Sequence, residues 1–192
     1  MISNRFAILG ALIILLAVLI IIYIRIGGKE KIKQEPLSLP PELTQSSDEQ
    51  QEKKKVVLFY LSEKDAFLHP EVREIYAYSS LVQEAKQTVE ELLKESQNGY
   101  LSPIPPQTKL REIFLTRRGV AYVDFSKDFQ DSHPSGSTAE ILTIYSVVNS
   151  LAYNFKSIKR VFILIEGAEK ETLGGHVNLN KPFLPRYSLI AK

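Results

Sequence analysis

A run of apolar residues near the N-terminus constrains this chain more than any other feature of its sequence. From Phe6 to Ile24 the sequence reads FAILGALIILLAVLIIIYI, without a charged side chain, and Arg5 and Arg25 bound it. As an α-helix this stretch would span about 28 Å, close to the roughly 30 Å hydrocarbon thickness of a bilayer. A core helix of a soluble domain is expected to have a polar side, which this stretch lacks. Residues 6–26 are therefore predicted to form one transmembrane helix.

The apolar segment does not have the form of a cleaved signal peptide. Such a peptide has an apolar core of about 7 to 15 residues and a cleavage site of small residues, and no such site precedes Gly27. The orientation of the span stays open. Basic residues after the span outnumber those before it, which by itself favours a cytoplasmic domain. These residues are Arg25, Lys29, Lys31 and Lys33, against Arg5 alone. Acidic neighbours and the ability of long domains to cross membranes weaken that bias.

Composition divides the chain into four parts. Residues 1–5 are a short tail before the span 6–26. Residues 27–55 contain prolines and a run of charged and glutamine side chains, a composition that cannot bury a core and predicts a flexible linker. Residues 56–192 show the mixed pattern of a folded domain. A domain of that length can bury about two thirds of its unfolded surface, so it needs neither disulfides nor metals to fold.

Two properties of the whole chain exclude classes of function. The sequence has no cysteine, which excludes disulfides, thiolate metal sites, a thiol nucleophile and an acylated N-terminal cysteine. The formal net charge is only +2, and no basic stripe alternates with aromatic residues, so nucleic acid is not expected as a partner.

The first part of the domain is predicted to contain two strands and a helix. Val56–Leu61 is rich in β-branched and aromatic residues, and Arg73–Tyr78 alternates between two faces, as strands do. Ser80 and Gln83 have the spacing of a capping box, and Asn98-Gly99 supplies a left-handed stop, so a helix is expected between them. Its apolar stripe consists of Val82, Ala85, Val89, Leu92 and Leu93.

A proline-rich loop, a hairpin, a second helix and a last strand follow. The loop 101–110 holds three prolines, which fix φ and remove backbone donors. Strands 110–116 and 120–125 flank a turn ending in Gly119, which can take a positive φ. Ser137 and Glu140 predict a second capping box, and the run 161–165 predicts a buried strand. The stripe of the second helix consists of Ile141, Ile144, Tyr145, Val148, Leu151, Ala152 and Phe155.

This order of elements predicts the fold class. Strand, strand, helix, two hairpin strands, helix and strand match a two-layer α+β sandwich, in which both helices pack on one face of a mixed sheet. The opposite face and the edges of that sheet would then be exposed, and partners bind small domains at such places.

Five stretches of the domain resemble the GerMN domain of sporulation and spore germination proteins. They are Leu101-Ser102-Pro103 with Pro105 and Thr108; Val123-Asp124-Phe125-Ser126 with Phe129; Gly136-Ser137 with Glu140; Tyr145 with Val148-Asn149-Ser150-Leu151; and Thr172-Leu173-Gly174-Gly175-His176-Val177 with Leu179. The resemblance covers residues 56–186, in the order of the family. The last stretch and the Ser-Pro-x-Pro loop are its most specific parts.

The resemblance carries expectations about place and partners. It implies a fold similar to the ring-building domains of secretion systems, on a single-pass anchor in the cytoplasmic (inner) membrane, with the domain facing away from the cytoplasm. One family member takes part in the channel complex between mother cell and forespore; this chain differs from it by a single domain copy and no lipid-attachment cysteine. The family-motif residues, expected to be structural, are Ser102, Pro103, Pro105, Asp124, Ser126, Ser137, Glu140, Asn149, Gly174, Gly175 and His176.

No catalytic, cofactor or metal site is predicted from the residues. His69, His133 and His176 lie far apart, and none has a second ligand at helical spacing. The spacing of Asp124, Asp128 and Asp131 does not fit a calcium loop. No serine lies in a nucleophile elbow, and Gly174-Gly175 lacks the lysine of a phosphate-binding loop.

Two functions therefore remain open. The first is a non-catalytic scaffold or interaction module of the envelope, with a protein partner or by self-association into a ring. The second is an accessory domain of cell-wall metabolism that binds peptidoglycan or a small ligand through tyrosines such as Tyr76, Tyr78 or Tyr100. A wall enzyme would require a site that the sequence does not reveal.

Overall fold

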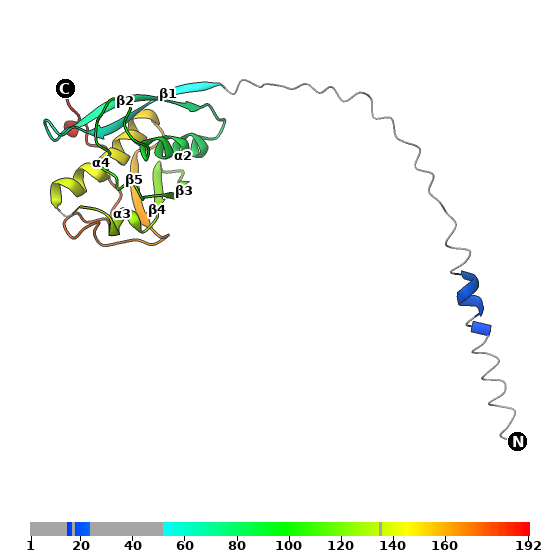
Figure 1. Ribbon diagram of the computed structural model, residues 1–192. Coiled ribbons are helices and arrows are strands. Elements are labelled where there is room, and N and C mark those ends of the chain that lie inside the picture. The colour runs from blue at the N-terminus through cyan, green and yellow to red at the C-terminus, as the bar shows by residue number, and fades with distance from the viewer. Residues whose placement is uncertain (1–14, 17, 24–51, 135) are drawn as a thin grey trace, which may run out of the picture. The chain divides into compact units, whose positions relative to one another are not determined.

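The computed structural model describes residues 15–16, 18–23, 52–134 and 136–192 (Figure 1). The chain divides into two units, Met1–Ser47 and Asp48–Lys192. In the first unit the described residues are helical and exposed. No helix within the described part of the chain has the length and apolar character needed to cross a membrane. Most of the predicted span 6–26, the tail and nearly all of the linker lie outside the described residues, and their boundaries remain predictions.

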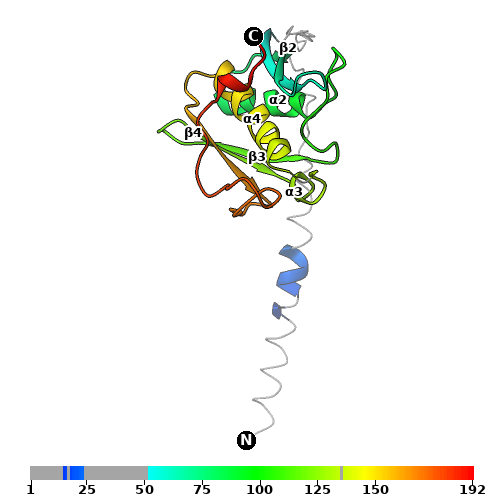
Figure 2. The same cartoon turned by 90° about the vertical axis from the view of Figure 1, so that its left-hand side faces the viewer.

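The second unit has three layers, seen in both Figure 1 and Figure 2. A two-stranded antiparallel sheet forms one outer layer, and a three-stranded mixed sheet in the order β3-β4-β5 forms the other. Two helices lie between the sheets, and each contacts strands of both. The strands are β1 (Lys53–Leu61), β2 (Leu68–Tyr76), β3 (Leu110–Leu115), β4 (Val120–Phe125) and β5 (Arg160–Ile165). The helices are α2 (Leu81–Leu92) and α4 (Ser137–Asn154), with short turns at α3 (Asp128–Asp131) and η1 (Tyr187–Leu189).

The α+β class is confirmed, but the predicted arrangement of one sheet with two helices on one face is wrong. The strands form two separate sheets, and the helices fill the space between them. In α4 every residue from Ser146 to Ala152 is buried, which is nearly two full turns. A helix covered on one side only would show a polar stripe over that length. The two-stranded sheet ends at β1 because side chains of α4, and not another strand, bond the free backbone groups along that edge.

The bounds of β2 and α2 differ from the predicted ones, because a proline and a glycine each occur in more than one structural context. β2 begins at Leu68, earlier than predicted, and contains Pro70 opposite Phe59. A proline fits there because β2 is an edge strand, so its missing N–H breaks no ladder. α2 ends at Leu92; Gly99 does adopt a positive φ, of 77°, but in a later turn.

The predicted capping boxes are also wrong. Ser80 is the N-cap of α2, but its side chain makes no capping hydrogen bond. In α4 the N-cap is Gly136, so Ser137 is the first helical residue, again without a side-chain cap. Glu140 therefore does not reach back to the helix start.

Buried polar groups hold the chain that leads out of α2. The hydroxyl of the fully buried Tyr60 donates to the carbonyls of Glu91 and Lys94, each at 3.1 Å. Burial raises the pKa of Tyr60 to about 12. The Glu71 carboxylate accepts from Arg73 Nε and from Ser96 Oγ, both at 2.6 Å. These bonds fix the segment that precedes the proline-rich loop.

Candidate functional site

The proline-rich loop is fixed to β1 at one end and to α4 at the other. Leu101 exchanges two backbone hydrogen bonds of 2.9 Å with Leu61, the last residue of β1. The Ser102 hydroxyl bonds the backbone N–H and C=O of Ile104, whose side chain is buried. The carbonyl of Pro103 accepts a hydrogen bond from Thr143 Oγ1 of α4. The loop therefore keeps a defined shape.

A surface hollow of about 290 Å³ lies between this loop and the start of α4. It is continuous with a second hollow that shares three of its lining residues. We call the combined feature the loop groove; its central residues are Leu61, Leu101, Pro103, Pro105 and Ala139. Its walls are largely apolar, and Leu101 is 45% exposed. Three of these five residues, Leu101, Pro103 and Pro105, belong to the first of the five stretches that resemble the family.

His133 supports the groove from behind. Its Nε2 lies 2.7 Å from Thr143 Oγ1. Because that hydroxyl donates to Pro103, the histidine must be the donor, and burial lowers the pKa of His133. A neutral ring with the proton on Nε2 satisfies both conditions. His133 thus contributes to holding the loop, a role that its sequence context did not suggest.

Glu140 holds the Gly174-Gly175-His176 loop. Its side chain is fully buried in the first turn of α4. The carboxylate accepts from the amides of His176 at 3.2 Å and Val177 at 2.8 Å, and lies 2.7 Å from Nδ1 of the His176 ring. Burial alone would raise the pKa of Glu140, but the Val177 amide, the His176 ring and the amides of Gly174 and His176 together lower it. Glu140 is therefore ionised at neutral pH.

Gly174 is needed because Glu140 comes so close. A Cβ atom on Gly174 would lie 2.9 Å from Glu140 Oε1 and 3.3 Å from its Cδ. Gly175 has a φ of 103°, which side chains other than glycine rarely adopt. The two glycines thus serve different purposes, close approach at the first and backbone conformation at the second.

Asp124 holds a different turn, at the end of β5. Its Oδ1 accepts from the Gly167 amide at 2.8 Å, and its Oδ2 accepts from Arg111 Nε at 3.0 Å. Arg111 also bonds Glu166 Oε2 at 2.8 Å, and Glu166 has a positive φ of 54°. The ion pair therefore fixes a turn whose backbone is strained.

Ser126 and the neighbouring aspartates are engaged locally. Ser126 Oγ accepts from the Lys109 amide at 3.0 Å and bonds Asp128 Oδ2 at 3.1 Å. Asp131 faces Lys127 at 4.0 Å. The three aspartates of this stretch thus point to separate partners. In residues 15–16, 18–23, 52–134 and 136–192, no three His, Cys, Asp or Glu side chains gather as a metal site would require.

Polar residues at every fourth position of α4 close the free edge of β1. Ser150 Oγ accepts from the Phe59 amide at 3.1 Å, and Ser146 Oγ donates to the Phe59 carbonyl at 2.6 Å. Asn154 bonds both backbone groups of Val57, at 2.9 and 2.7 Å. Sequence reasoning missed this stripe, although three polar side chains at i, i+4 and i+8 of an apolar helix were a visible signal.

The family-motif residues are distributed over several places. Ser102, Pro103 and Pro105 share one loop, and Glu140, Gly174, Gly175 and His176 meet at another. Asp124 and Ser126 lie around the end of β4. Asn149 bonds the backbone N–H and C=O of Arg186, at 2.9 and 3.1 Å, and Ser137 is exposed at the start of α4.

The chemistry that this arrangement can support is limited. A buried carboxylate bonded to a half-exposed imidazole, as in Glu140–His176, orients a general base in some hydrolases. In those hydrolases the base activates a hydroxyl or thiol nucleophile within hydrogen-bond reach. The ring of His176 is 49% exposed, and within the described part of the chain its one polar side-chain contact is Glu140.

Comparison with known proteins identifies the domain type. A family model described as Germane, sporulation and spore germination, matches residues 57–171. The first GerMN domain of the Bacillus subtilis sporulation protein GerM has a similar structure, with 22% identity and a TM-score of 0.53 over 69% of this chain and 98% of that domain. The tandem GerMN domains of the same protein give 21% identity and a TM-score of 0.54, over 71% of this chain and 48% of that one.

A candidate lipoprotein from Clostridium perfringens also shares the fold. Its crystal structure is 23% identical, with a TM-score of 0.50 over 69% of this chain and 87% of that one. No curated protein matches the sequence significantly. The resemblance to the GerMN domain is confirmed by the family model, which covers more than half of the 192 residues. The chain belongs to the Germane (GerMN) family, whose description is sporulation and spore germination.

Proposed function

We propose that this chain is a membrane-anchored envelope protein whose GerMN domain binds other proteins and catalyses no reaction. The observation that carries this proposal is that the motif carboxylates bond other parts of the domain with both of their oxygens. Glu140 directs both carboxylate oxygens to the loop around His176, and Asp124 directs both of its oxygens to Arg111 and Gly167. A carboxylate that acts as an acid or base catalyst must keep an oxygen available to substrate. These two residues instead maintain the shape of the His176 loop and of the turn at Gly167.

The loop groove is the proposed docking site for a protein partner. Its apolar walls lie on a loop that hydrogen bonds hold from both ends, so little conformational entropy is lost on binding. Leu101 and Pro103 project from that loop beside Ala139 of α4. An extended apolar segment of a partner fits such a groove better than a polar ligand would.

The place of action follows from the sequence and the family together. Residues 6–26 are proposed to anchor the chain in the cytoplasmic membrane, and residues 27–55 to connect the anchor to a domain outside the cytoplasm. The family description, and the description of the Clostridium perfringens protein as a lipoprotein, support an envelope role in sporulation or germination.

Site-directed photo-crosslinking in native membranes tests the proposal. A photoreactive phenylalanine analogue replaces Leu101 in the groove or, as a control, Phe114 in β3 of the three-stranded sheet. The two positions are 45% and 55% exposed. Leu101 is expected to give adducts of defined mass with another protein, whereas Phe114 gives none. The absence of adducts at Leu101, or equal adducts at both positions, would contradict groove docking.

Wall binding through tyrosines has weaker support. Tyr100 is half-buried and packs against His69 at 5.0 Å between ring centroids. The Tyr78 hydroxyl is bonded to Gln87, and Tyr76 lies on another part of β2. Sedimentation of the domain with purified sacculi free of protein would favour this alternative.

A further inference from the structure

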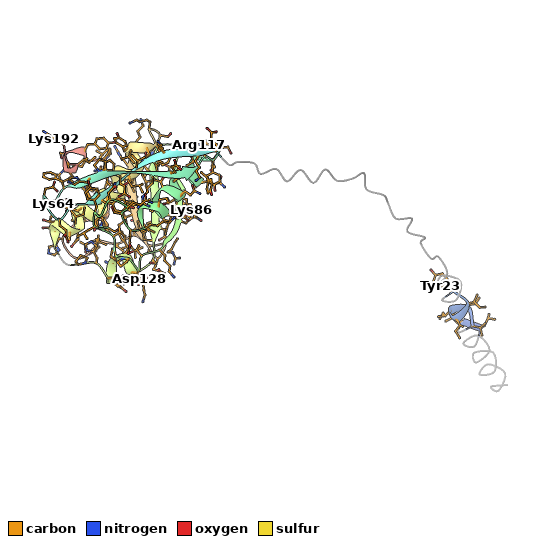
Figure 3. The ribbon with its side chains drawn as sticks, turned by 45° about the horizontal axis from the view of Figure 1, so that its top comes forward. Tyr23, Lys64, Lys86, Arg117, Asp128 and Lys192 are labelled. Atoms are coloured by element: carbon orange, nitrogen blue, oxygen red, sulfur yellow. The ribbon has the colours of Figure 1, made fainter. Side chains whose placement is uncertain are left out.

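The outward side of the two-stranded sheet carries exposed apolar side chains. Figure 3 looks toward this sheet, with Lys64 and Lys192 near the end where the two strands connect. We call this surface the hairpin face and define it by Val57, Phe67, Val72, Tyr153 and Tyr187. Four of the five are more than 40% exposed: Val72 at 56%, Tyr153 and Tyr187 at 46%, and Phe67 at 42%.

Contacts connect these residues into one surface. Val57 and Val72 are register partners, and Val57 is two residues from Phe59, so all three side chains project to the same side. The ring of Tyr153 meets Phe59 edge-on at 5.5 Å, and Tyr187 meets Tyr153 at 6.3 Å. Phe67 and Tyr187 line a common hollow beside Ile190. Exposed apolar surface that is continuous in this way marks an interaction site.

Lysines surround the apolar part of the hairpin face. Lys156 Nζ lies 5.8 Å from the centre of the Tyr153 ring. Lys55 is exposed and two residues from Val57, so it projects to the same side. Lys192 lines the hollow that contains Tyr187. Lys53 also belongs to this side, where it lies 3.7 Å from Glu74.

Two acidic groups near this surface have partners within the domain. Glu74 faces Lys53, and Asp65 lies 2.8 Å from His69 Nε2. Lys55, Lys156 and Lys192 add positive charge to the hairpin face. The partner of this surface should therefore be anionic, and it should offer apolar depth for the aromatic rings.

We propose that the hairpin face docks on the anionic surface of a lipid bilayer. Lysine is depleted at protein interfaces but binds anionic headgroups, and tyrosine, like tryptophan, is enriched at the boundary between headgroups and hydrocarbon. β1 begins at Lys53, so its first three residues are the last three of the predicted linker 27–55, which is proposed to lead from the membrane anchor. The inference thus rests on the proposed membrane location and adds a second, reversible contact with the same bilayer.

Sedimentation with lipid vesicles tests this docking. The experiment uses the fragment 48–192, which is a compact unit with its own hydrophobic core. Vesicles of phosphatidylcholine alone are compared with vesicles that also contain phosphatidylglycerol. The fragment is expected to sediment with the anionic vesicles only, and to be released by high salt because screening shortens the reach of the lysine charges.

Charge-reversal variants locate the binding surface. Lys55→Glu with Lys156→Glu is expected to lower the affinity for anionic vesicles by at least about fivefold for each lysine. Lys127→Glu with Lys181→Glu is the matched control, because it changes the net charge equally at exposed positions away from this sheet. It should retain the affinity of the wild type within about twofold.

The contribution of apolar contact with the bilayer is tested by a second pair of variants in the same sedimentation experiment. Tyr187→Ser should weaken vesicle binding several-fold, whereas Phe114→Ser, on the other sheet, should not. Thermal unfolding of each variant verifies that it is folded. Three results would overturn the inference: no sedimentation with anionic vesicles, equal binding to neutral vesicles, or equal losses in the two lysine variants. If docking fails while the full chain remains in the membrane fraction, the proposed function stands without it.

Discussion

The carboxylate of Glu140 and the Nδ1 atom of His176 are 2.7 Å apart, although 36 residues separate them along the chain. The carboxylate is fully buried and the imidazole is half exposed. Burying a charge is costly unless hydrogen bonds compensate for lost water, and here two amides and the ring do so. The start of α4 is thereby joined to the most specific stretch of the family motif.

Replacement of Glu140 by glutamine should destabilise the domain by about 2 to 3 kcal/mol, because a neutral amide presents its own NH2 group to amide donors in a buried site. Urea unfolding monitored by circular dichroism measures the change. Glu169→Gln, at an exposed position, is the control and should have an effect within about 0.5 kcal/mol. Equal midpoints for both variants would mean that Glu140 does not hold the loop.

Gly174→Ala should be more destabilising when Glu140 is present than when it is absent. The added Cβ would lie 2.9 Å from Oε1 of the carboxylate, so one of the two groups must move. In a double-mutant cycle with Glu140→Ala, the alanine at 174 should cost at least about 1 kcal/mol less than in the wild-type background. Additive effects of the two substitutions would refute the close approach.

The stability of the domain should fall in acid in a way that depends on Glu140. The pKa values of Glu140 and Glu71 are both lowered in the folded state from an ordinary value of 4.5. The folded state therefore binds fewer protons than the unfolded one. The stabilisation from each group is complete above pH 4.5 and is lost as the pH falls through the folded pKa.

Urea midpoints measured from neutral pH down to about pH 3 test this linkage. Wild-type stability should decline below pH 4.5, and the stability of Glu140→Gln should decline less steeply because one carboxyl group with a lowered pKa is gone. Parallel pH profiles for wild type and variant would contradict the lowered pKa of Glu140.

Ser150→Ala should open the edge of β1. The substitution leaves the buried Phe59 amide without its acceptor, at a cost of about 1 to 3 kcal/mol. Hydrogen exchange at Phe59 should accelerate accordingly. Ser137→Ala is a matched change in the same helix and should be nearly neutral, because the Ser137 hydroxyl caps nothing. A loss near 1 kcal/mol at Ser137 would instead restore the predicted capping box.

Local patterns along the chain predicted the elements well where a residue type occurs in only one structural context. The bounds of β4 agree with prediction, and the hairpin before it turns at Gly119 with a φ of 78°. Both long helices and the buried strand β5 lie where periodicity placed them. The family stretches were also recognisable, because glycine and proline positions depend on backbone geometry more than on neighbours.

Long-range pairing could not be predicted from such patterns. Ser137 and Glu140 have capping-box spacing, yet Glu140 bonds a loop 36 residues away, because several hydrogen bonds to a buried carboxylate are worth more than a cap on an exposed helix end. The division into two sheets depends on α4 side chains replacing a strand at the edge of β1. Periodicity identifies an apolar face but does not say how many faces of a helix are covered.

The central claim is that this GerMN domain works while attached to a membrane by its own N-terminal segment. Fractionation of cells that express the full-length chain tests it most directly, with the N-terminus verified by mass spectrometry. The chain should sediment with membranes, resist high salt and alkaline carbonate, and dissolve only in detergent, whereas a variant lacking residues 1–26 should be released by high salt and carbonate. Recovery of the intact full-length chain in the soluble fraction would contradict the account.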